Sequence, residues 1–357
     1  MLTLLLFACS GKDVADDTAA PAVDPLSWAI DAPGPYNTGH RYWELTYEPL
    51  APSGETRTIG VNVWYPTEDT EGDDVEYLGA FEDEASLGNA SIAAPAHDGG
   101  WPVRVHSHGS QAWGGHSEWL NQHMASHGWI TVAPDHTENT LLDHIDPSRA
   151  SHYIHRPQDI IEALDAFAAE PDFADAVTDR VLLSGHSRGC GTVWTSAGAV
   201  FDPATMAVTC EGFPDGGCTT EELDVFLSGA LADARVVGAI PMGCGYSDDF
   251  FGDAPSGNIA PFFMMTGSED SNNLPEHFDA MTAVDRTWID IEGACHETFG
   301  LGVACDTIDG EEGFTIVEAY TLAFGRSVVL GDTSVDGVLD GSEAISERVT
   351  LRSAASR

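Results

Sequence analysis

An apolar run leads into the pattern Gly-x-Ser-x-Gly in Val181-Leu182-Leu183-Ser184-Gly185-His186-Ser187-Arg188-Gly189-Cys190. In a strand that turns sharply into a helix, this pattern exposes its serine at the tip of the turn, and the two glycines leave room for the backbone. The stretch therefore predicts Ser187 as a nucleophile. The next backbone N–H, that of Arg188, lies at a helix N-terminus and is expected to face the oxyanion that forms in acyl transfer.

A strand that ends in His-Gly lies upstream, in Pro102-Val103-Arg104-Val105-His106-Ser107-His108-Gly109-Ser110. The loop after such a strand is where hydrolases with this serine turn place their second oxyanion donor. We expect that donor to be the backbone N–H of Ser110.

The acid and the base are expected downstream, each after a strand. A buried strand over residues 261–267 is followed by Glu269 and Asp270, and a strand over residues 286–291 is followed by His296. A histidine that takes the serine proton needs a carboxylate to fix its tautomer and stabilise its charge. We assign the base to His296 and the acid to Asp270. Glu269, one residue nearer the strand, stays open as the alternative acid.

The other histidines form no metal motif. The chain has 14 histidines, and those nearest the predicted site are too irregularly spaced for a zinc site such as His-Glu-x-x-His. We expect them to be structural or exposed, and we expect catalysis without a cofactor. These histidines are His106, His108, His116, His123, His127 and His136.

Strand and helix patterns alternate along the chain, which predicts an α/β fold with a mostly parallel central sheet and helices on both faces. The order serine, acid, histidine is that of the α/β-hydrolase fold. Helices are expected over residues 159–169 and 313–330. A hydrophobic content of 43% suffices for one large domain, placed in residues 39–330. Two more polar segments, residues 67–100 and 202–230, are expected to be insertions that shape the pocket.

Several stretches resemble the bacterial α/β-hydrolases known as predicted dienelactone hydrolases, which are close to platelet-activating-factor acetylhydrolases and to cutinase-like polyester hydrolases. With the serine turn, the acid strand and the histidine loop, the resemblance spans about residues 40–328. It implies an α/β-hydrolase fold and an ester hydrolase. The stretches are Ile59–Pro66, Ser107–Ser110, His127–Trp129, Ala133–His136 and Arg156–Ile160, the last of which is expected to open an amphipathic helix.

Two residues depart from that group. Dienelactone hydrolases proper have a cysteine nucleophile where this chain has Ser187, which moves the resemblance toward esterases. Cys190 stands where a second glycine commonly follows the turn, and this change affects the packing of the helix. The pentapeptide Gly185–Gly189 is also similar to that of chlorophyllase, a related esterase branch.

Charge narrows the function. The formal net charge of −44 at pH 7 excludes nucleic acid and anionic membranes as electrostatic partners and weighs against polyanionic substrates. We expect a serine carboxylic ester hydrolase for neutral short-chain esters or polyesters. The alternatives are a platelet-activating-factor-type phospholipid acetylhydrolase and a catalytically silent binding scaffold.

Trp113, Trp119 and Tyr246 are candidate apolar walls of the site, with ordinary core packing as the alternative.

The amino terminus has the features of an export signal. An apolar run over residues 2–8 is too short to span a bilayer and ends at Cys9 in Leu6-Phe7-Ala8-Cys9, which resembles a bacterial lipobox. We expect residues 1–9 to be a signal peptide with a lipidated cysteine as the membrane anchor. Residues 10–38 are expected to be a flexible acidic tether. The protein is accordingly expected to be an outer-membrane lipoprotein or a secreted protein.

Six further cysteines fit disulfides and an oxidising compartment. Short intervening loops favour the pairs Cys210–Cys218 and Cys295–Cys305, which leaves Cys190 with Cys244. The Cys295–Cys305 bridge would clamp the loop that carries His296. Buried free thiols are the alternative for Cys190 and Cys244.

The carboxyl-terminal tail, residues 331–357, contains a pattern typical of a twelve-residue EF-hand calcium loop. Side chains with oxygen atoms stand at loop positions 1, 3, 5, 9 and 12, a glycine stands at position 6, and a backbone carbonyl falls at position 7. A structural calcium ion is one expectation for the tail, and a solvated acidic tail is the other. The candidate ligands are Asp332, Ser334, Asp336, Val338, Asp340 and Glu343.

Overall fold

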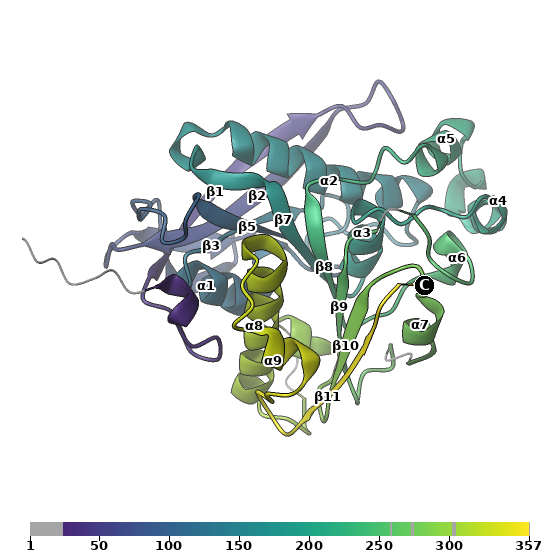
Figure 1. Ribbon diagram of the computed structural model, residues 1–357. Coiled ribbons are helices and arrows are strands. Elements are labelled where there is room, and N and C mark those ends of the chain that lie inside the picture. The colour runs from purple at the N-terminus through teal and green to yellow at the C-terminus, as the bar shows by residue number, and fades with distance from the viewer. Residues whose placement is uncertain (1–23, 258, 273–274, 302–304, 357) are drawn as a thin grey trace, which may run out of the picture.

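One mixed sheet organises the molecule (Figure 1). The computed structural model describes residues 24–257, 259–272, 275–301 and 305–356, and within them eleven strands form one sheet in the order β11-β10-β9-β8-β7-β5-β6-β2-β1-β4-β3. The strands are β1 Asn37–Tyr47, β2 Arg57–Thr67, β3 Asp73–Tyr77, β4 Phe81–Gly88, β5 Trp101–Ser107, β6 Ile130–Asp135, β7 Ala176–His186, β8 Val236–Met242, β9 Phe262–Gly267, β10 Arg286–Ile291 and β11 Val349–Ala354.

The centre of the sheet is parallel. Neighbouring strands from β10 through β9, β8, β7 and β5 to β6 all pair in parallel, and β11 and β2 pair antiparallel with the two ends of this group. This arrangement confirms the predicted α/β-hydrolase fold class. Because parallel strands place their carboxyl ends at one edge of the sheet, the loops after β5, β7, β9 and β10 meet there.

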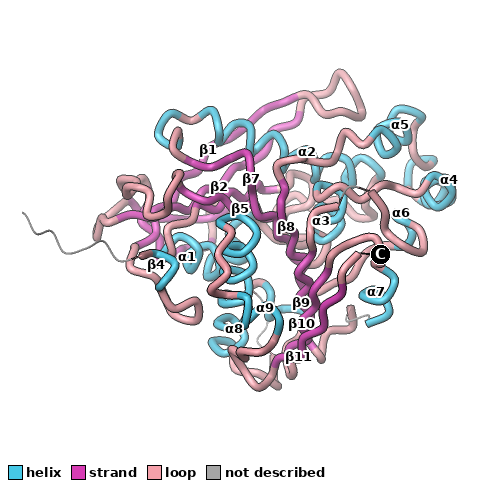
Figure 2. The backbone as a smooth tube through the Cα atoms, viewed as in Figure 1, coloured by secondary structure: helices cyan, strands magenta, loops and turns pink. Residues whose placement is uncertain are grey.

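Helices cover both faces of the sheet (Figures 1 and 2). Successive side chains of a strand point to opposite faces. Val181 and Leu183 accordingly join one core cluster with α2 and α3, whereas Leu182 joins a second cluster with α1 and α8. The helices are α1 Glu118–Ser126, α2 Ala150–Ala169, α3 Gly189–Ser196, α4 Pro203–Gly212, α5 Thr220–Ser228, α6 Asp248–Phe251, α7 Pro275–Ala280, α8 Gly310–Gly325 and α9 Asp336–Asp340.

The apolar segment Gly310–Leu330 has the length and composition of a membrane span. In the structure it comprises α8 and one further helical turn, and 61% of its most apolar window is buried inside the protein. Its side chains pack in the second core cluster against β8 and β9. Its hydrophobicity is therefore explained by the core.

Helix α2 begins earlier than the sequence predicted. It starts at Ala150, and Pro157 lies inside it, so the expectation that Arg156-Pro157 opens the helix is wrong. Proline removes one backbone donor from a helix. The helix continues through this position because Ile154 before it and Ile160 after it are both buried in the core, and this packing outweighs one missing hydrogen bond.

Residues 24–36 and 349–354 belong to the folded body, in contrast to the predicted tether and tail. Val349–Ala354, expected in a separate tail, forms β11 and pairs with all of β10. Residues 24–36, expected in the tether, are held by the guanidinium of Arg326, which donates to the carbonyl oxygens of Leu26 and Trp28. Main-chain bonds of this kind do not depend on apolar side chains, so the polar composition of both segments concealed them.

The two polar segments expected as insertions have different positions. Residues 67–100 contribute β3 and β4, which extend the sheet at the edge farthest from β11. Residues 202–230 form α4 and α5, which contact α6 and α2 respectively. The first segment thus belongs to the sheet itself.

Candidate active site

Ser187 occupies a strained turn between β7 and α3. Its backbone φ is +54°, a left-handed conformation that is uncommon for residues other than glycine. The Ser187 N–H donates to the carbonyl oxygen of Met242 at 3.0 Å, which ties the turn to the end of β8. Positive φ at the serine is what a sharp strand-to-helix turn requires, because it exposes the hydroxyl at the tip.

The glycines on either side of Ser187 are required by close backbone contacts. A Cβ atom at Gly189 would lie 2.1 Å from the carbonyl oxygen of Ser107, and one at Gly185 would lie 2.7 Å from the carbonyl oxygen of Gly189. Any larger residue would therefore push α3 away from β5 and β7. The pentapeptide is determined by this geometry, as the sequence pattern predicted.

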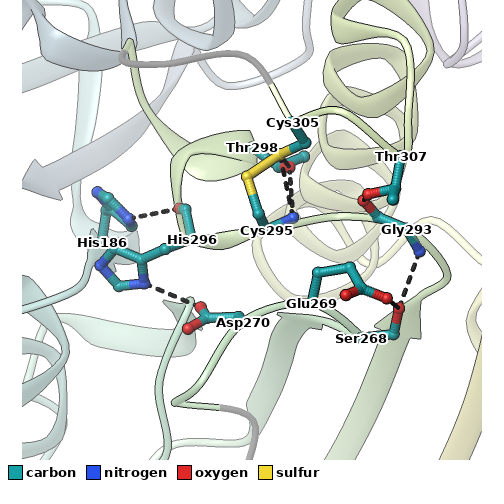
Figure 3. The surroundings of a disulfide bond; sticks show 10 residues. All are labelled: His186, Ser268, Glu269, Asp270, Gly293, Cys295, His296, Thr298, Cys305 and Thr307. Carbon is teal, nitrogen blue, oxygen red and sulfur yellow. Dashed lines mark hydrogen bonds and ion pairs between the residues drawn. A yellow bond between two sulfur atoms is a disulfide. The ribbon is translucent and has the colours of Figure 1, made fainter.

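His296 and Asp270 are hydrogen-bonded (Figure 3). His296 Nδ1 lies 2.9 Å from Asp270 Oδ2, and the Asp270 side chain is fully buried while that of His296 is 28% exposed. The other carboxylate oxygen, Oδ1, accepts the backbone N–H of Asn272 at 2.8 Å. The hydrogen bond to Asp270 raises the pKa of His296 above its ordinary value. This arrangement leaves Nε2 of His296 free to take a proton from a nucleophile.

Glu269, the alternative acid, faces away from the histidine (Figure 3). Its side chain is exposed and accepts a hydrogen bond from Ser268 Oγ at 3.5 Å. Of the two adjacent carboxylates, only Asp270 therefore contacts His296. The one-residue difference at the end of β9 turns one side chain inward and the next outward.

The three predicted residues meet at the carboxyl edge of the sheet. A Cβ at Gly243, the residue after the Met242 that binds Ser187, would lie 3.2 Å from both Asp270 Oδ2 and His296 Nδ1. Ser187 Oγ makes no hydrogen bond to any residue that the structure describes. Hydrogen bonds of this type are often long without substrate and tighten in the reacting complex.

Both predicted oxyanion donors flank Ser187. Arg188 caps α3, and a Cβ at Gly109 would lie 3.4 Å from the Cβ of Ser187, which places the loop Gly109-Ser110 beside the nucleophile. Within the described chain the backbone N–H groups of Arg188 and Ser110 have no hydrogen-bond acceptor. Two unsatisfied N–H groups on either side of a serine are suited to bind a developing oxyanion.

A buried polar network supports the loop that carries Ser110. Arg156, fully buried, donates to the carbonyl oxygen of His108, to Ser107 Oγ at 3.2 Å and to Asn139 Oδ1. Asn139 in turn donates to Ser110 Oγ at 3.2 Å. Burial and the neighbouring Arg188 lower the pKa of the Arg156 guanidinium.

The buried Asp159 of α2 binds residues of β2 and of the loop after β6. Its carboxylate binds Arg57 Nε and Nη2, each at 2.8 Å, and His136 Nδ1 at 2.8 Å. The charge of Arg57 holds the pKa of Asp159 below its ordinary value, and burial lowers the pKa of His136 to about 3. The sequence does not predict this network, because Arg156 and Asp159 share α2 with other charged residues, and only the structure shows that these two are buried.

The candidate walls of the pocket are mostly core residues. Trp113 stacks on Phe81 with ring centroids 4.3 Å apart, and Trp119 stacks on Phe314 at 4.1 Å. Tyr246 is 9% exposed and donates its hydroxyl to the carbonyl oxygen of Asp253 at 2.7 Å. Trp113 and Tyr246 belong to core clusters, and Trp119 packs against one, so the alternative of ordinary core packing describes all three.

The structure contains three disulfides, Cys190–Cys244, Cys210–Cys218 and Cys295–Cys305. The spacing favoured the last two, and the first is the remaining pair, for which free thiols were the alternative. The first joins the beginning of α3 to the loop after β8, close to Ser187. The third lies directly beside His296 (Figure 3). The Cys295 N–H also donates to Thr298 Oγ1 at 3.1 Å, which supports the turn that carries the histidine.

We expect loss of the Cys295–Cys305 bridge, through the double substitution Cys295→Ala and Cys305→Ala, to lower ester hydrolysis more than its effect on stability explains. The bridge closes a short loop, for which the entropic contribution to the free energy of unfolding is about 2–3 kcal/mol. The matched control is Cys210→Ala with Cys218→Ala, because that bridge closes a loop of similar length away from His296. Activity and melting temperature are measured for both; equal activity losses in the two variants would contradict the prediction.

The tail gives the calcium prediction no support. Asp332 Oδ2 forms an ion pair with Arg326 at 2.7 Å, and its Oδ1 accepts the Ser334 N–H at 2.8 Å. Asp336–Asp340 is helical and Val338 is buried in the core. In the part of the chain that is described, no group of three or more His, Cys, Asp or Glu side chains is arranged to hold a metal ion. The predicted ligands therefore do not fit a calcium loop here.

The predicted signal peptide and lipobox cysteine, Cys9, lie outside the described residues. The expected export, lipidation and surface location therefore stay predictions.

Comparison with known proteins supports an ester hydrolase. The model of the chlorophyllase family, a family of α/β-hydrolase-type esterases, matches residues 81–207. The matched region runs from β4 to α4 and includes Ser110, Ser187 and Arg188, but not Asp270 or His296. A search among curated proteins gives no match. The α/β-hydrolase fold, together with this similarity to a family of esterases, supports a hydrolase that acts on esters.

Proposed function

We propose that the protein is a serine carboxylic ester hydrolase that acts through an acyl-enzyme on Ser187. The observation that carries the proposal is the hydrogen bond between His296 and the buried Asp270, at the same sheet edge as the strained Ser187. A carboxylate, an imidazole and a serine in this chain order support nucleophilic acyl transfer.

In the proposed reaction, Ser187 Oγ attacks the ester carbonyl while His296 Nε2 takes the hydroxyl proton. The carbonyl oxygen becomes an oxyanion, which the backbone N–H groups of Arg188 and Ser110 bind. The carbon–oxygen bond to the alcohol then breaks, and His296 gives its proton to the departing alcohol. Water, deprotonated by His296, attacks the acyl-enzyme, and the acid leaves as Ser187 recovers its proton. Asp270 keeps the imidazole in the productive tautomer throughout.

The activity is expected to depend on pH through His296. Only the neutral imidazole accepts the Ser187 proton, and the bond to Asp270 raises the pKa of His296 above 6.5. The value of kcat/KM for a neutral aryl ester should therefore fall as the pH drops through a midpoint above 6.5. A kcat/KM profile between about pH 5 and pH 9 measures this midpoint. A flat profile, or a midpoint well below 6.5, would contradict the assigned base.

For the substrate, we propose neutral short-chain esters or polyesters, because a formal net charge of −44 repels polyanions. The second candidate, a platelet-activating-factor-type phospholipid acetylhydrolase, is compatible with the same triad. Purified protein is compared on aryl esters of increasing acyl length, a polyester film, a phospholipid with a short sn-2 acyl chain, and chlorophyll, for which the matched family is named. Hydrolysis of the phospholipid alone would favour the second candidate. A catalytically silent scaffold would hydrolyse none of them.

We also propose that the protein is exported, as an outer-membrane lipoprotein or a secreted protein. Three disulfides support an oxidising compartment. Fractionation of cells that express the full chain, with mass spectrometry of the mature amino terminus, tests the location and the modification of Cys9. Recovery of unprocessed protein in the cytoplasm would contradict export.

A further inference from the structure

His186, the residue before Ser187, contacts the base directly. His186 Nε2 lies 3.0 Å from the backbone carbonyl oxygen of His296, and the two rings have centroids 4.7 Å apart (Figure 3). A carbonyl oxygen only accepts hydrogen bonds, so the His186 proton resides on Nε2 and is donated to it. His186 is 3% exposed, so its side of this contact is shielded from water.

This contact acts through a hydrogen bond and not through charge. Burial lowers the pKa of His186 to about 3, so its ring is neutral at the pH of catalysis. His116, which stacks on His186 at 6.0 Å, also has its pKa lowered by burial. Among the described groups that act on His296, the charged ones are therefore Asp270, hydrogen-bonded to it, and the neighbouring Glu297.

The turn that carries the base, His296–Phe299, is held at both ends. His186 binds the carbonyl of its first residue, and Ser117 Oγ donates to the carbonyl of Phe299 at 3.2 Å. Beyond the turn, the Leu301 N–H donates to the carbonyl of His116 at 2.7 Å. A Cβ at Gly300 would lie 2.3 Å from the His116 ring, so the chain passes closely over this pair of imidazoles.

We propose that His186 is a positioning residue that holds His296 in reach of both Asp270 and Ser187. The inference rests on the proposed serine mechanism. The backbone of His186 leads directly into the nucleophile, while its side chain binds the residue that serves as base. His186 thus fixes the positions of both Ser187 and His296, between which the proton is transferred. Its contact with the His296 carbonyl also keeps the His296 backbone where Nδ1 reaches Asp270. Displacements of about 1 Å in such a geometry cost roughly 100-fold in rate.

Three substitutions separate this role from simple packing. His186→Gln places an amide N–H near the position of Nε2 and should retain most of the activity. His186→Asn has the same amide but is too short to reach the His296 carbonyl, and His186→Met fills the space without a donor. We expect kcat/KM to fall roughly 10- to 100-fold in the Asn and Met variants, with the loss in kcat rather than KM.

The pH dependence of kcat/KM separates positioning from packing, because a purely structural role of His186 would leave this dependence unchanged. Without the His186 contact, the bond from His296 to Asp270 is populated less, so the pKa of His296 should fall toward its ordinary value of 6.5. The acid limb of the kcat/KM profile should shift to lower pH in the Asn and Met variants and stay in place in the Gln variant. If Met prevents folding, the comparison of Asn with Gln decides.

The matched control is His127→Met. His127 is 2% exposed and makes the same kind of bond, from Nε2 to the carbonyl of Ala32 at 2.9 Å, far from the turn of the base. Its loss should lower the melting temperature without changing the acid limb. Equal activities and pH profiles in the Gln, Asn and Met variants of His186, or the same profile shift in His127→Met, would overturn the proposal. Fluorophosphonate labelling of wild-type Ser187 distinguishes these outcomes from a failure of the serine mechanism itself, which would leave the wild type unlabelled.

Discussion

Replacing Ser187 with alanine is expected to reduce hydrolysis of short-chain aryl esters by about 10⁴-fold or more, because the proposed acyl-enzyme forms on the Ser187 hydroxyl. The substitution removes one oxygen atom from a side chain that makes no hydrogen bond to the described residues, and alanine tolerates the same turn. The melting temperature should therefore stay close to that of the wild type. Steady-state hydrolysis and thermal unfolding of the purified variant measure the two effects.

Ser196→Ala is a matched control for Ser187→Ala. Ser196 is a fully buried serine at the end of α3, and its hydroxyl has no partner among the described residues. This control should leave ester hydrolysis within about twofold of the wild type. Full activity in Ser187→Ala would refute Ser187 as the nucleophile, and an equal loss in Ser196→Ala would indicate that packing of α3 is responsible.

Asp270→Asn is expected to lower kcat by about 10³- to 10⁴-fold. An asparagine amide cannot stabilise the imidazolium. It also favours the tautomer in which His296 Nε2 carries the proton, and in that tautomer Nε2 cannot accept the proton of Ser187. The fully buried Asp270 accepts from His296 at 2.9 Å, so the change acts directly on the base. Kinetics of the purified variant, with circular dichroism to verify folding, give the measurement.

Glu269→Gln provides the comparison for Asp270→Asn, since it makes the same chemical change one residue earlier. Glu269 is exposed and faces Ser268 rather than the histidine. Its rate should remain within about twofold of the wild type, as for most exposed substitutions. A larger loss in Glu269→Gln than in Asp270→Asn would move the role of the acid to Glu269.

The serine turn was predictable because its geometry tolerates few residues. The close approach of Gly189 to the carbonyl of Ser107, and the positive φ of Ser187, restrict the sequence to the observed pattern. The parallel centre of the sheet was predictable for a similar reason, because strands buried on both faces read as continuous apolar runs. The order of Asp270 and His296 after two such runs then followed from the fold.

Other features depend on contacts that a sequence pattern does not contain. Glu269 and Asp270 follow the same strand, and only the direction of the chain after β9 distinguishes them. The calcium prediction depended only on the spacing of oxygen-bearing side chains in the sequence. The ion pair that Asp332 forms with Arg326 is visible only in the structure. The contact of His186 with His296 is not predictable from the sequence, because its partner is a backbone carbonyl, which every residue possesses.

The most direct test of the account is covalent labelling of the native protein with a fluorophosphonate, followed by digestion and mass spectrometry of the modified peptide. The reagent requires a serine that a neighbouring base has activated. We predict one adduct, on Ser187, that disappears on denaturation before labelling and in Ser187→Ala. The absence of an adduct in the folded wild type, or an adduct on a different serine, would contradict the claim that Ser187, His296 and Asp270 act as a catalytic triad.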